Sequence, residues 1–335
     1  MKIPYGMIDT QVNGYLGYDY SDPAFKPEWA EKICTALVKK GTLQHFATIV
    51  TRPTDVILRN IDSIVRACRE SEVVKKCLTG IHIEGNFISS EDGPRGAHDR
   101  RYVRSADIKE FDSWLEHSCG LLKYITVGAE AKGIAELIRH AVSCGVAVAL
   151  GHTGATSEQI ERAVDAGASV STHLGNGVFQ TLDRFENPLW PQLRDERLTA
   201  GVIADMCHVT PDLLWIISRC KKPERIILVS DLAPCAGLPK GRLKWGSMDV
   251  EIAGDGSVRL AGTPYLAGAG AVLLEDVFNW ASCTGFSIQS AVESASIVPI
   301  KKYGLEFRED DYIETDSEGK LLKVCLAGSE VDLKN

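Results

Sequence analysis

The stretch ALGHTGATSEQIERAVDAGASVSTHLGNG, residues 149–177, carries two histidines at equivalent points of two successive strand-like segments. His152 and His173 each come after a short apolar run. A helical segment separates them, with Thr156 as an N-cap candidate and Gly167 as a C-terminal stop. A strand–helix–strand unit of this kind predicts two parallel strands of one sheet, with both imidazoles at the same edge.

The same alternation of apolar runs and helical segments extends along the whole chain. Eight short apolar or β-branched runs are strand candidates, and segments with apolar residues at helical spacing separate them. Eight such units predict an α/β fold, a distorted (β/α)8 TIM barrel. A doubly wound open sheet is the alternative, but no GxGxxG motif follows the first strand candidate. The eight candidates are residues 6–9, 45–50, 78–85, 124–130, 146–152, 169–174, 199–205 and 225–231.

Two segments depart from this alternation. Within a barrel domain predicted over residues 1–305, residues 248–263 have the pattern of a β-hairpin that turns at Asp255 and Gly256. Residues 306–335 predict two short strands around a Ser-Glu-Gly turn. We expect these C-terminal strands to form a reduced small β element beside the barrel.

Composition excludes several classes of protein. The 335 residues carry a formal net charge of -8 and are 44% hydrophobic, which allows a large core and argues against a nucleic-acid partner. No apolar run approaches the roughly 20 residues that span a bilayer, and no long apolar stretch follows the start of the chain. We therefore expect neither a membrane segment nor a signal peptide. The 10 cysteines include no CxxC pair, which predicts reduced, mostly buried thiols in a cytoplasmic protein.

Most of the strong ligands and acid/base groups fall at one face of the predicted barrel. In a TIM barrel, the residues at the carboxyl ends of the strands face the active site. A single histidine at a strand end is more often structural than functional, but a set gathered at one face indicates a site. The polar residues at or just after the strand ends are Asp9, Gln11, Asn13, His82, Glu84, His152, His173, Asp205, His208 and Asp231.

Glu84, His152 and His173 offer one carboxylate and two imidazoles. This ligand set suits Zn²⁺ and leaves a position open for water. Such a site lowers the pKa of bound water toward about 7 and polarises a substrate carbonyl. Asp231 would take a proton from that water and later give it to the leaving group. The pattern predicts metal-assisted hydrolysis, most naturally of an amide.

We expect the other polar residues to support the ligands or to have structural roles, without taking part in the reaction. His82 lies two residues before Glu84 and therefore points to the same side of its strand, where we expect packing or support of the ligand. We expect Asp205 to orient a neighbour or to satisfy backbone groups. The histidines expected to have ordinary structural or surface roles are His45, His117 and His140.

Eight segments resemble the motifs of one enzyme family, in the family's order. They are MIDTQVNG, GIHIEGNFIS, GPRGAH, GHTGAT, STHLGNG, IADMCHV, ILVSDLAPCAG and LAGAGAVLLEDV. With them, nearly the whole chain resembles the N-acetylglucosamine-6-phosphate deacetylase family of the amidohydrolase superfamily. The resemblance implies a TIM-barrel hydrolase with one divalent metal ion. It also implies the release of acetate from an N-acetylated amino sugar, N-acetylglucosamine 6-phosphate above all, in cytoplasmic amino-sugar metabolism.

The resemblance also implies roles for single residues. Glu84, His152 and His173 match the family's metal ligands, and Asp231 matches its general acid/base. Gln11 stands where many amidohydrolases begin an HxH motif that holds a second metal, so we expect one metal, with Gln11 lining the site. The residues implied to contact the substrate are His98, Asn176, Gly177, His208, Leu266, Ala267 and Gly268, with Arg184 as a candidate for binding phosphate.

Departures from the family's pattern leave alternatives open. The loop after His173 reads GNG where members carry an aromatic residue, and Arg184 could instead be a loop residue paired with Asp183 or Glu186. The family's longer N-terminal arm is absent, which indicates a divergent, shortened member whose C-terminal strands are the remnant of a small β-sandwich. The alternative substrates are an unphosphorylated N-acetylhexosamine or another N-acyl compound. A non-catalytic sugar-binding barrel is the third reading.

The metal and the partners follow from the same residues. Imidazole and carboxylate ligands suit Zn²⁺ first, and also Fe²⁺, Co²⁺ or Mn²⁺. The expected partner is a small-molecule amino sugar, with neither a nucleic acid nor a membrane. The resemblance also implies a homodimer.

Overall fold

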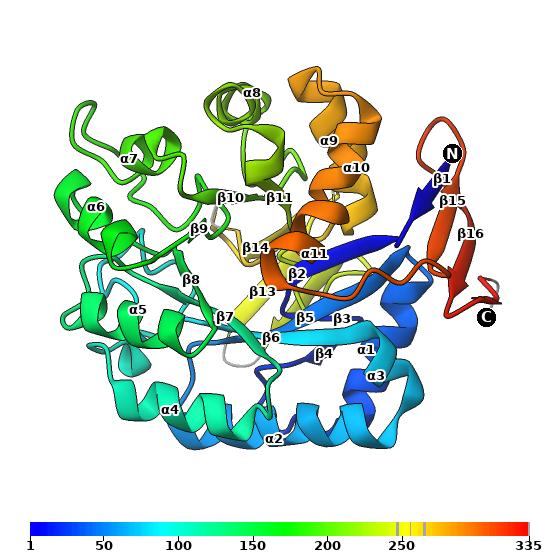
Figure 1. Cartoon of the computed structure of the whole chain (residues 1–335), viewed down its shortest axis with the longest axis horizontal. Helices are drawn as coiled ribbons and strands as arrows, with labels where there is room; N and C mark the ends of the chain where they lie inside the picture. Colours follow the sequence, from blue (N-terminus) through cyan, green and yellow to red (C-terminus); the bar gives the residue numbers. More distant parts are fainter. Residues whose placement is uncertain (246–247, 255, 264–265, 334–335) are drawn as a thin grey trace.

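The computed structural model describes residues 1–245, 248–254, 256–263 and 266–333. Its centre is one eight-stranded sheet whose strands pair in parallel and curve into a barrel, with helices around it (Figure 1). All eight predicted strands are present, and they lie side by side in chain order, which confirms the barrel. The strands are β2 (Met7–Val12), β5 (Thr42–Val50), β6 (Leu78–Glu84), β7 (Leu122–Val127), β8 (Ala147–Leu150), β9 (Val170–Ser171), β10 (Thr199–Val202) and β11 (Ile226–Leu228).

The later strands end sooner than their apolar runs predict. The strand expected over 169–174 is only β9, two residues long, and the strand expected over 225–231 is β11, which ends at Leu228. His173 and Asp231 have φ angles of 28° and 52°, so the chain leaves the extended conformation at or before them. The apolar pattern does not separate the strand from the turn that follows it, because both are buried.

Helices cover the outer face of the sheet. The helix expected between His152 and His173 is α6 (Ser157–Asp165), and Thr156 caps its start in a capping box with Gln159. Its apolar side chains are buried, as in an amphipathic barrel helix. The other helices are α1 (Pro27–Val38), α2 (Thr54–Glu70), α3 (Glu72–Cys77), α4 (Ile108–His117), α5 (Ile134–Ser143), α7 (Leu189–Arg194), α8 (Pro211–Cys220), α9 (Leu273–Thr284), α10 (Ile288–Ser294) and α11 (Ile297–Tyr303), with the short 3-10 helices η1 (Arg100–Tyr102) and η2 (Pro223–Arg225).

The barrel closes at a seam between β2 and β11, the two edge strands of the sheet. Among the described residues, no ladder of strand hydrogen bonds joins these two strands. Instead, Val12 and Leu232 form an isolated parallel bridge, and the N–H of Asn13 donates to the carbonyl of Leu232 at 3.1 Å. Leu232 also bridges Ala269. Closure therefore depends on the segments that follow the strands, which are the segments that carry the site.

A small three-stranded sheet follows the barrel strands in the chain. β13 (Met248–Ile252) and β14 (Val258–Leu260) pair as the predicted hairpin, whose expected turn residue Asp255 lies outside the described residues. β12 (Gly241–Trp245) adds a strand that the sequence reading missed. A further two-stranded sheet consists of β3 (Gly14–Tyr15) and β4 (Tyr18–Asp19).

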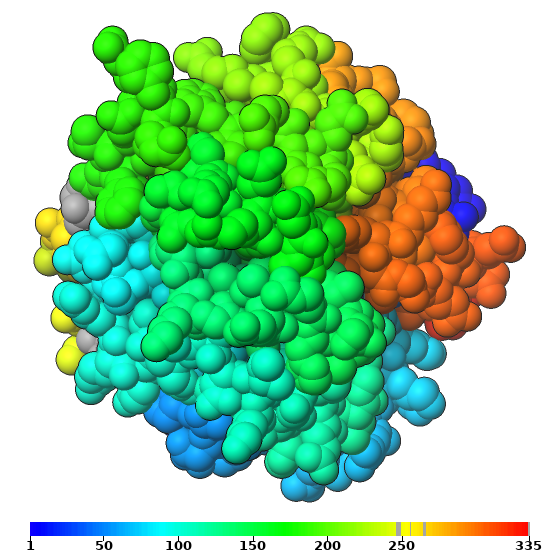
Figure 2. Space-filling view, turned by 60° about the vertical axis from the view of Figure 1, so that its left-hand side comes forward, coloured from blue at the N-terminus to red at the C-terminus, as the bar shows by residue number. Residues whose placement is uncertain are grey.

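The sheet beside the barrel combines both ends of the chain. β15 (Tyr312–Thr315) and β16 (Leu321–Leu326) are the two strands predicted near the C-terminus, and β17 (Ser329–Glu330) extends them. β1 (Lys2–Pro4) pairs with β15, so the expectation that this element comes from the C-terminus alone is incomplete. Both termini lie beside it (Figure 1), and in Figure 2 it lies at the rim of a face formed by the middle of the chain.

Two further sequence predictions can be compared with the structure. No described helix has both the length and the apolar composition needed to cross a membrane. All ten cysteines are free thiols, as expected, but the prediction that most are buried is wrong. Only Cys34, Cys77, Cys235 and Cys325 are buried, because the others lie on helix surfaces and loops that face partly outward.

Asp276 in α9 is a buried carboxyl group without a compensating partner. Its side chain is 0% exposed, and neither of its oxygens has a hydrogen-bond partner among the described residues. Burial, together with the nearby carboxylates of Asp205 and Asp9, raises its pKa well above the ordinary value. Because the folded state binds this proton more tightly than the unfolded state does, the free energy of unfolding falls as the pH rises above roughly 4.

We therefore expect Asp276→Asn to stabilise the protein at neutral pH. The amide has nearly the same shape and never ionises, so the free energy of unfolding should rise by roughly 1–3 kcal/mol, with the gain shrinking toward pH 4. Urea unfolding at several pH values measures this difference. Asp310→Asn, at an exposed position, is the control, and a gain that does not depend on pH would contradict the explanation.

Candidate metal and catalytic centre

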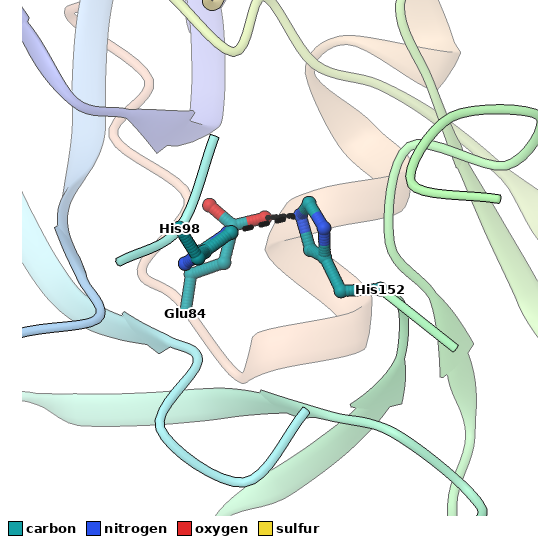
Figure 3. A group of neighbouring side chains, drawn as sticks. All are labelled: Glu84, His98 and His152. Carbon is teal, nitrogen blue, oxygen red and sulfur yellow. Dashed lines mark hydrogen bonds and ion pairs between the residues drawn. The ribbon is translucent and has the colours of Figure 1, made fainter. Parts of the chain in front are cut away.

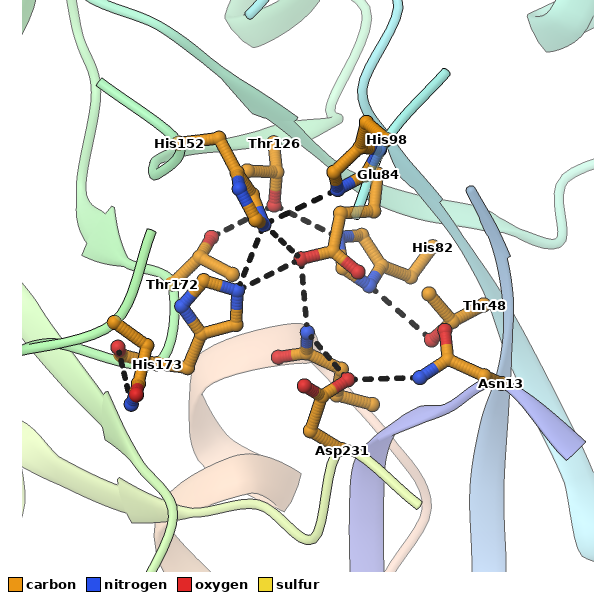
Figure 4. Close-up of polar contacts among 12 residues, drawn as sticks. Asn13, Thr48, His82, Glu84, His98, Thr126, His152, Thr172, His173 and Asp231 are labelled. Atoms are coloured by element: carbon orange, nitrogen blue, oxygen red, sulfur yellow. Dashed lines mark hydrogen bonds and ion pairs between the residues drawn. The ribbon is translucent and has the colours of Figure 1, made fainter. Parts of the chain in front are cut away.

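The predicted site residues meet at the mouth of the barrel. Glu84 is the last residue of β6, whereas His152, His173 and Asp231 follow the ends of β8, β9 and β11 (Figure 4). These last three residues have positive φ angles of 49°, 28° and 52°. Such angles are uncommon outside glycine and are typical of functional sites. The strained turns bring side chains from four parts of the chain to one point.

Glu84, His152 and His173 converge on that point. Nε2 of His173 lies 3.0 Å from both Glu84 Oε1 and His152 Nε2, and His152 Nε2 lies 3.3 Å from Glu84 Oε1. The three side chains are between 3% and 9% exposed. Burial alone would raise the pKa of Glu84, but hydrogen bonds from the two imidazoles hold it well below its ordinary value.

This donor set fits a divalent metal ion. Two imidazole Nε2 atoms that face each other at 3.0 Å share at most one proton, so they cannot both donate and their lone pairs compete. A cation between the imidazoles and the carboxylate would satisfy all three donors at once. The other nitrogen of His152 supports this arrangement, because Nδ1 lies 2.9 Å from the carbonyl of Pro94 and so directs the lone pair of Nε2 inward.

His98 joins this group, which its expected role as a sugar contact did not predict. Its Nε2 lies 3.2 Å from His152 Nε2, and its Nδ1 lies 2.8 Å from Thr51 Oγ1. One donor atom each of Glu84, His98 and His152 lies within 4.8 Å of the other two (Figure 3). His98 is therefore a fourth candidate ligand, although its Nε2 makes a described close contact with His152 alone, whereas Nε2 of His173 lies 3.0 Å from both Glu84 and His152.

Asp231 is bound by two side-chain amides from β2 and the residue after it. Asn13 Nδ2 donates to its Oδ1 at 2.8 Å, and Gln11 Nε2 donates to the same oxygen at 3.1 Å (Figure 4). Gln11 Nε2 also donates to Glu84 Oε1 at 3.0 Å, so one amide lies between the two carboxylates. Burial and the charge of Glu84 raise the pKa of Asp231 to about 6.

His82 lies beneath the site in a network of hydroxyl groups. Its two ring nitrogens lie 3.2 Å from Thr48 Oγ1 and 2.8 Å from Thr126 Oγ1, and its ring stacks on Tyr124. Burial lowers the pKa of His82 to about 3, so the ring is neutral. These contacts agree with the support role expected for it.

Asp205 and His208 form a second pair at the mouth. His208 Nδ1 lies 2.7 Å from Asp205 Oδ2, while Asp205 Oδ1 accepts the backbone N–H groups of Cys207 and His208. Asp205 thus orients His208, as expected, and it leaves Nε2 as the nitrogen available to a ligand. Burial would raise the pKa of Asp205, but the hydrogen bond and charge of His208 lower it.

The remaining expected substrate contacts occupy two loops near these groups. Asn176 bends back to the carbonyl of His173, to which its backbone N–H donates at 2.9 Å. A Cβ on Gly177 would lie 2.8 Å from His152 Nδ1, which explains why this loop carries glycine there. In the segment Leu266–Ala267–Gly268, Ala267 is buried, and Ala269, directly after this segment, donates its N–H to the carbonyl of Asp231 at 2.9 Å.

Arg184 lies apart from these contacts, in the loop between β9 and α7. Its guanidinium lies 4.5 Å from the ring centroid of Phe185, which is 75% exposed. Neither Asp183 nor Glu186, its alternative partners, forms a described ion pair with it; Asp183 instead accepts backbone N–H groups of its own loop. A phosphate role for Arg184 stays a prediction.

Comparison with curated proteins finds relatives along most of the chain. It is 32% identical over 313 residues to an N-acetylglucosamine-6-phosphate deacetylase of Bos taurus, which covers 91% of this chain and 75% of the relative. It is 31% identical over 299 residues to an N-acetylgalactosamine-6-phosphate deacetylase of Escherichia coli O157:H7, over 89% and 77% of the two chains. No family model matches the chain.

Solved structures of similar proteins have the same fold. An N-acetyl-D-glucosamine-6-phosphate deacetylase from Mycobacterium smegmatis superposes with a TM-score of 0.90 at 27% identity, over 99% of this chain and 88% of that one. A deacetylase of the same name from Thermotoga maritima has a TM-score of 0.85 at 23% identity, over 98% and 88%. The barrel architecture predicted from the sequence is thus that of its structural relatives.

Single substitutions distinguish the ligands from their neighbours. We expect Glu84→Gln and His173→Gln to lower zinc affinity by more than about 100-fold, because each removes a donor from the converging set, and His98→Gln to lower it by no more than about tenfold. Competition with a chelator and the rise in Tm on adding zinc measure this affinity. If His98→Gln abolishes binding while His173→Gln retains it, the two histidines exchange roles.

The expected role of Asp231 as a general base predicts a pH dependence of activity. A base must be ionised, so kcat/KM should fall as the pH drops through the pKa of Asp231, near or below 6, since a bound cation would lower that pKa further. Asp231→Asn should lose turnover by about 100-fold or more while still binding zinc. The exposed-loop variant Asp183→Asn is the control, and wild-type turnover in Asp231→Asn would rule out this role.

Proposed function

Because the chain belongs to the N-acetylglucosamine-6-phosphate deacetylase family, we propose that it hydrolyses the acetamide of N-acetylglucosamine 6-phosphate to glucosamine 6-phosphate and acetate. The observation that carries this proposal is the convergence of Glu84, His152 and His173 within 3.3 Å of one another, with Asp231 beside them. These residues combine ligands for one divalent cation with a buried carboxylate that can act as a base. Hydrolysis of an unactivated amide needs both a metal ion that polarises the carbonyl and a base that accepts a proton from water.

The chain's own residues supply proton transfer and positioning. A bound divalent cation would polarise the acetamide carbonyl and lower the pKa of water to about 7. Asp231 accepts a proton from the attacking water and delivers it to the amide nitrogen as the C–N bond breaks, which releases acetate and the free amine. Asn13 and Gln11 donate to Oδ1 of Asp231 and so leave Oδ2 to carry the proton.

We propose Zn²⁺ as the ion, held by Glu84, His152 and His173, with His98 beside His152 as a contact of the sugar. One carboxylate and two imidazoles are a ligand set that catalytic zinc accepts, although Fe²⁺, Co²⁺ and Mn²⁺ bind similar donors. A single ion is favoured because Gln11 and Asn13 offer amides where a second ion would need imidazoles. The ten free cysteines favour a reducing, cytoplasmic setting.

The sugar and its phosphate would lie against the loops around the metal group. We assign substrate contacts to His208, whose Nε2 is available, and to the loop of Asn176 and Gly177, with Leu266, Ala267 and Gly268 along the sugar. Arg184 fits a phosphate partner because its guanidinium makes no described ion pair and its fork of donors matches phosphate. Two large apolar side chains beside it, Phe185 at 75% and Trp190 at 48% exposure, favour a homodimer in which this segment is covered.

The experiment that tests this function measures acetate release from the zinc-loaded protein. We expect turnover of N-acetylglucosamine 6-phosphate, weaker turnover of N-acetylgalactosamine 6-phosphate, and little of free N-acetylglucosamine, because the phosphate anchors the substrate. Asp231→Asn is the inactive control. If the phosphorylated and the free sugar are turned over equally, the substrate is instead an unphosphorylated N-acetylhexosamine. If none of the three sugars is turned over, the proposed substrate class is wrong.

A further inference from the structure

The seam between β2 and β11 contains a carboxylate, Asp9, that is neither a candidate metal ligand nor one of the proposed substrate contacts. Asp9 lies in β2 and is 1% exposed. Its Oδ1 accepts the backbone N–H groups of Gln11 and Ser230, each at 3.2 Å, and its Oδ2 accepts the hydroxyl of Ser230. One side chain therefore joins β2 to the segment after β11, at the seam where the described residues form no ladder.

The hydrogen bonds of Asp9 fix the chain on both sides of Asp231. Ser230 comes directly before Asp231 and is bound to Asp9 through both its N–H and its hydroxyl. The same hydroxyl oxygen accepts the N–H of Leu232, directly after Asp231, at 3.1 Å. Asp231 itself has a φ of 52°, a conformation that persists only where the surroundings determine it.

The opposite side of the seam supplies the partners of the Asp231 carboxylate. Gln11, whose backbone is bound to Asp9, directs its side-chain amide to Asp231 Oδ1 at 3.1 Å. Asn13 reaches the same oxygen at 2.8 Å, and its backbone N–H donates to Leu232. Asp9 thus holds the backbone of both segments between which Asp231 lies.

Asp9 also lies in an environment that would not otherwise favour a carboxylate. Burial raises its pKa to about 7, while the hydrogen bonds from Ser230 and Gln11 oppose that shift. A buried carboxyl group costs free energy unless it is hydrogen-bonded, and an apolar side chain would pack there without that cost. We therefore expect Asp9 to be needed at this position for its hydrogen bonds to Gln11 and Ser230 and not for its packing.

We propose that Asp9 is a positioning residue for Asp231: by linking Gln11 to Ser230 across the seam, it fixes the strained turn and the direction of the Asp231 carboxylate. The inference rests on the proposed role of Asp231 as the base. Asp9 itself touches neither the converging donors nor, in this assignment, the substrate. Its loss should therefore change kcat much more than KM, because substrate binding is left to other loops.

Three single variants and one double variant test the proposal by steady-state kinetics. Asp9→Ala removes the link and should lower kcat by about 100-fold, the scale of a misplacement by about 1 Å, with KM changed by less than about threefold. Asp9→Asn keeps an oxygen for the two backbone N–H groups and should restore kcat to within about tenfold of wild type. Asp9→Ala and Ser230→Ala, which removes one arm of the link, should not be additive in the double variant.

Asp19→Ala is the matched control. Asp19 is a buried carboxylate that also accepts a backbone N–H, from Ser21 at 2.7 Å, and a side-chain N–H, from Trp245 at 2.7 Å. Its loss should lower Tm without the selective fall in kcat. If Asp9→Ala and Asp19→Ala change kcat and Tm alike, Asp9 is a structural residue only.

A crystal structure of Asp9→Asn and Asp9→Ala provides a readout that does not depend on the substrate. We expect Asp231 in Asp9→Ala to leave its left-handed conformation and to lose the contact with Asn13, while Asp9→Asn retains both. An unchanged Asp231 in Asp9→Ala would overturn the positioning role even if the protein deacetylates the sugar. A displaced Asp231 without sugar turnover in the wild type would instead count against the proposed substrate.

Discussion

The seam between β2 and β11 is the constraint on which the rest of the site depends. A parallel barrel is held together by strand ladders, yet here the two edge strands meet through Asp9, Ser230 and the bridge between Val12 and Leu232. Side-chain hydrogen bonds replace the ladder at the place where the chain must also leave the strands. The turn that carries Asp231 is therefore part of the closure of the barrel, and closing the barrel brings the Asp231 carboxylate to its amide partners.

The cluster of Glu84, His152 and His173 depends on a second constraint. Two imidazole nitrogens and a carboxylate oxygen are crowded together within 3.3 Å of one another. Imidazole nitrogens 3.0 Å apart and a carboxylate oxygen at the same distance form a stable arrangement only when charge or protons are shared among them. The fold enforces this crowding with turns of positive φ after β8 and β9. Support from Pro94 behind His152 and from the hydroxyl network around His82 reduces the freedom of these side chains to move apart.

The sequence predicts structure best where residue type and periodicity act locally. All eight strands, the helix between the two histidines and the C-terminal strand pair were predicted, because apolar runs and capping residues report local structure. The sequence does not predict β1, which is three residues long and pairs with β15 at the other end of the chain. Nor does it predict β12, because its residues GRLKW are mostly exposed and form no apolar run, although its partner β13 follows directly. It also gave His98 a sugar contact without anticipating that this ring lies 3.2 Å from His152.

The sequence alone determined the class of the fold and the chemical types available at the barrel mouth, because the alternation of apolar runs dictates the strands and their ends carry Glu84, His152, His173 and Asp231. Only the tertiary structure decided how these groups pair. Hydrogen bonds such as Gln11 with Asp231 join residues 220 positions apart, and those of Asp9 with Ser230 span 221. No local pattern records such distances, since they exist only once all eight strands have closed.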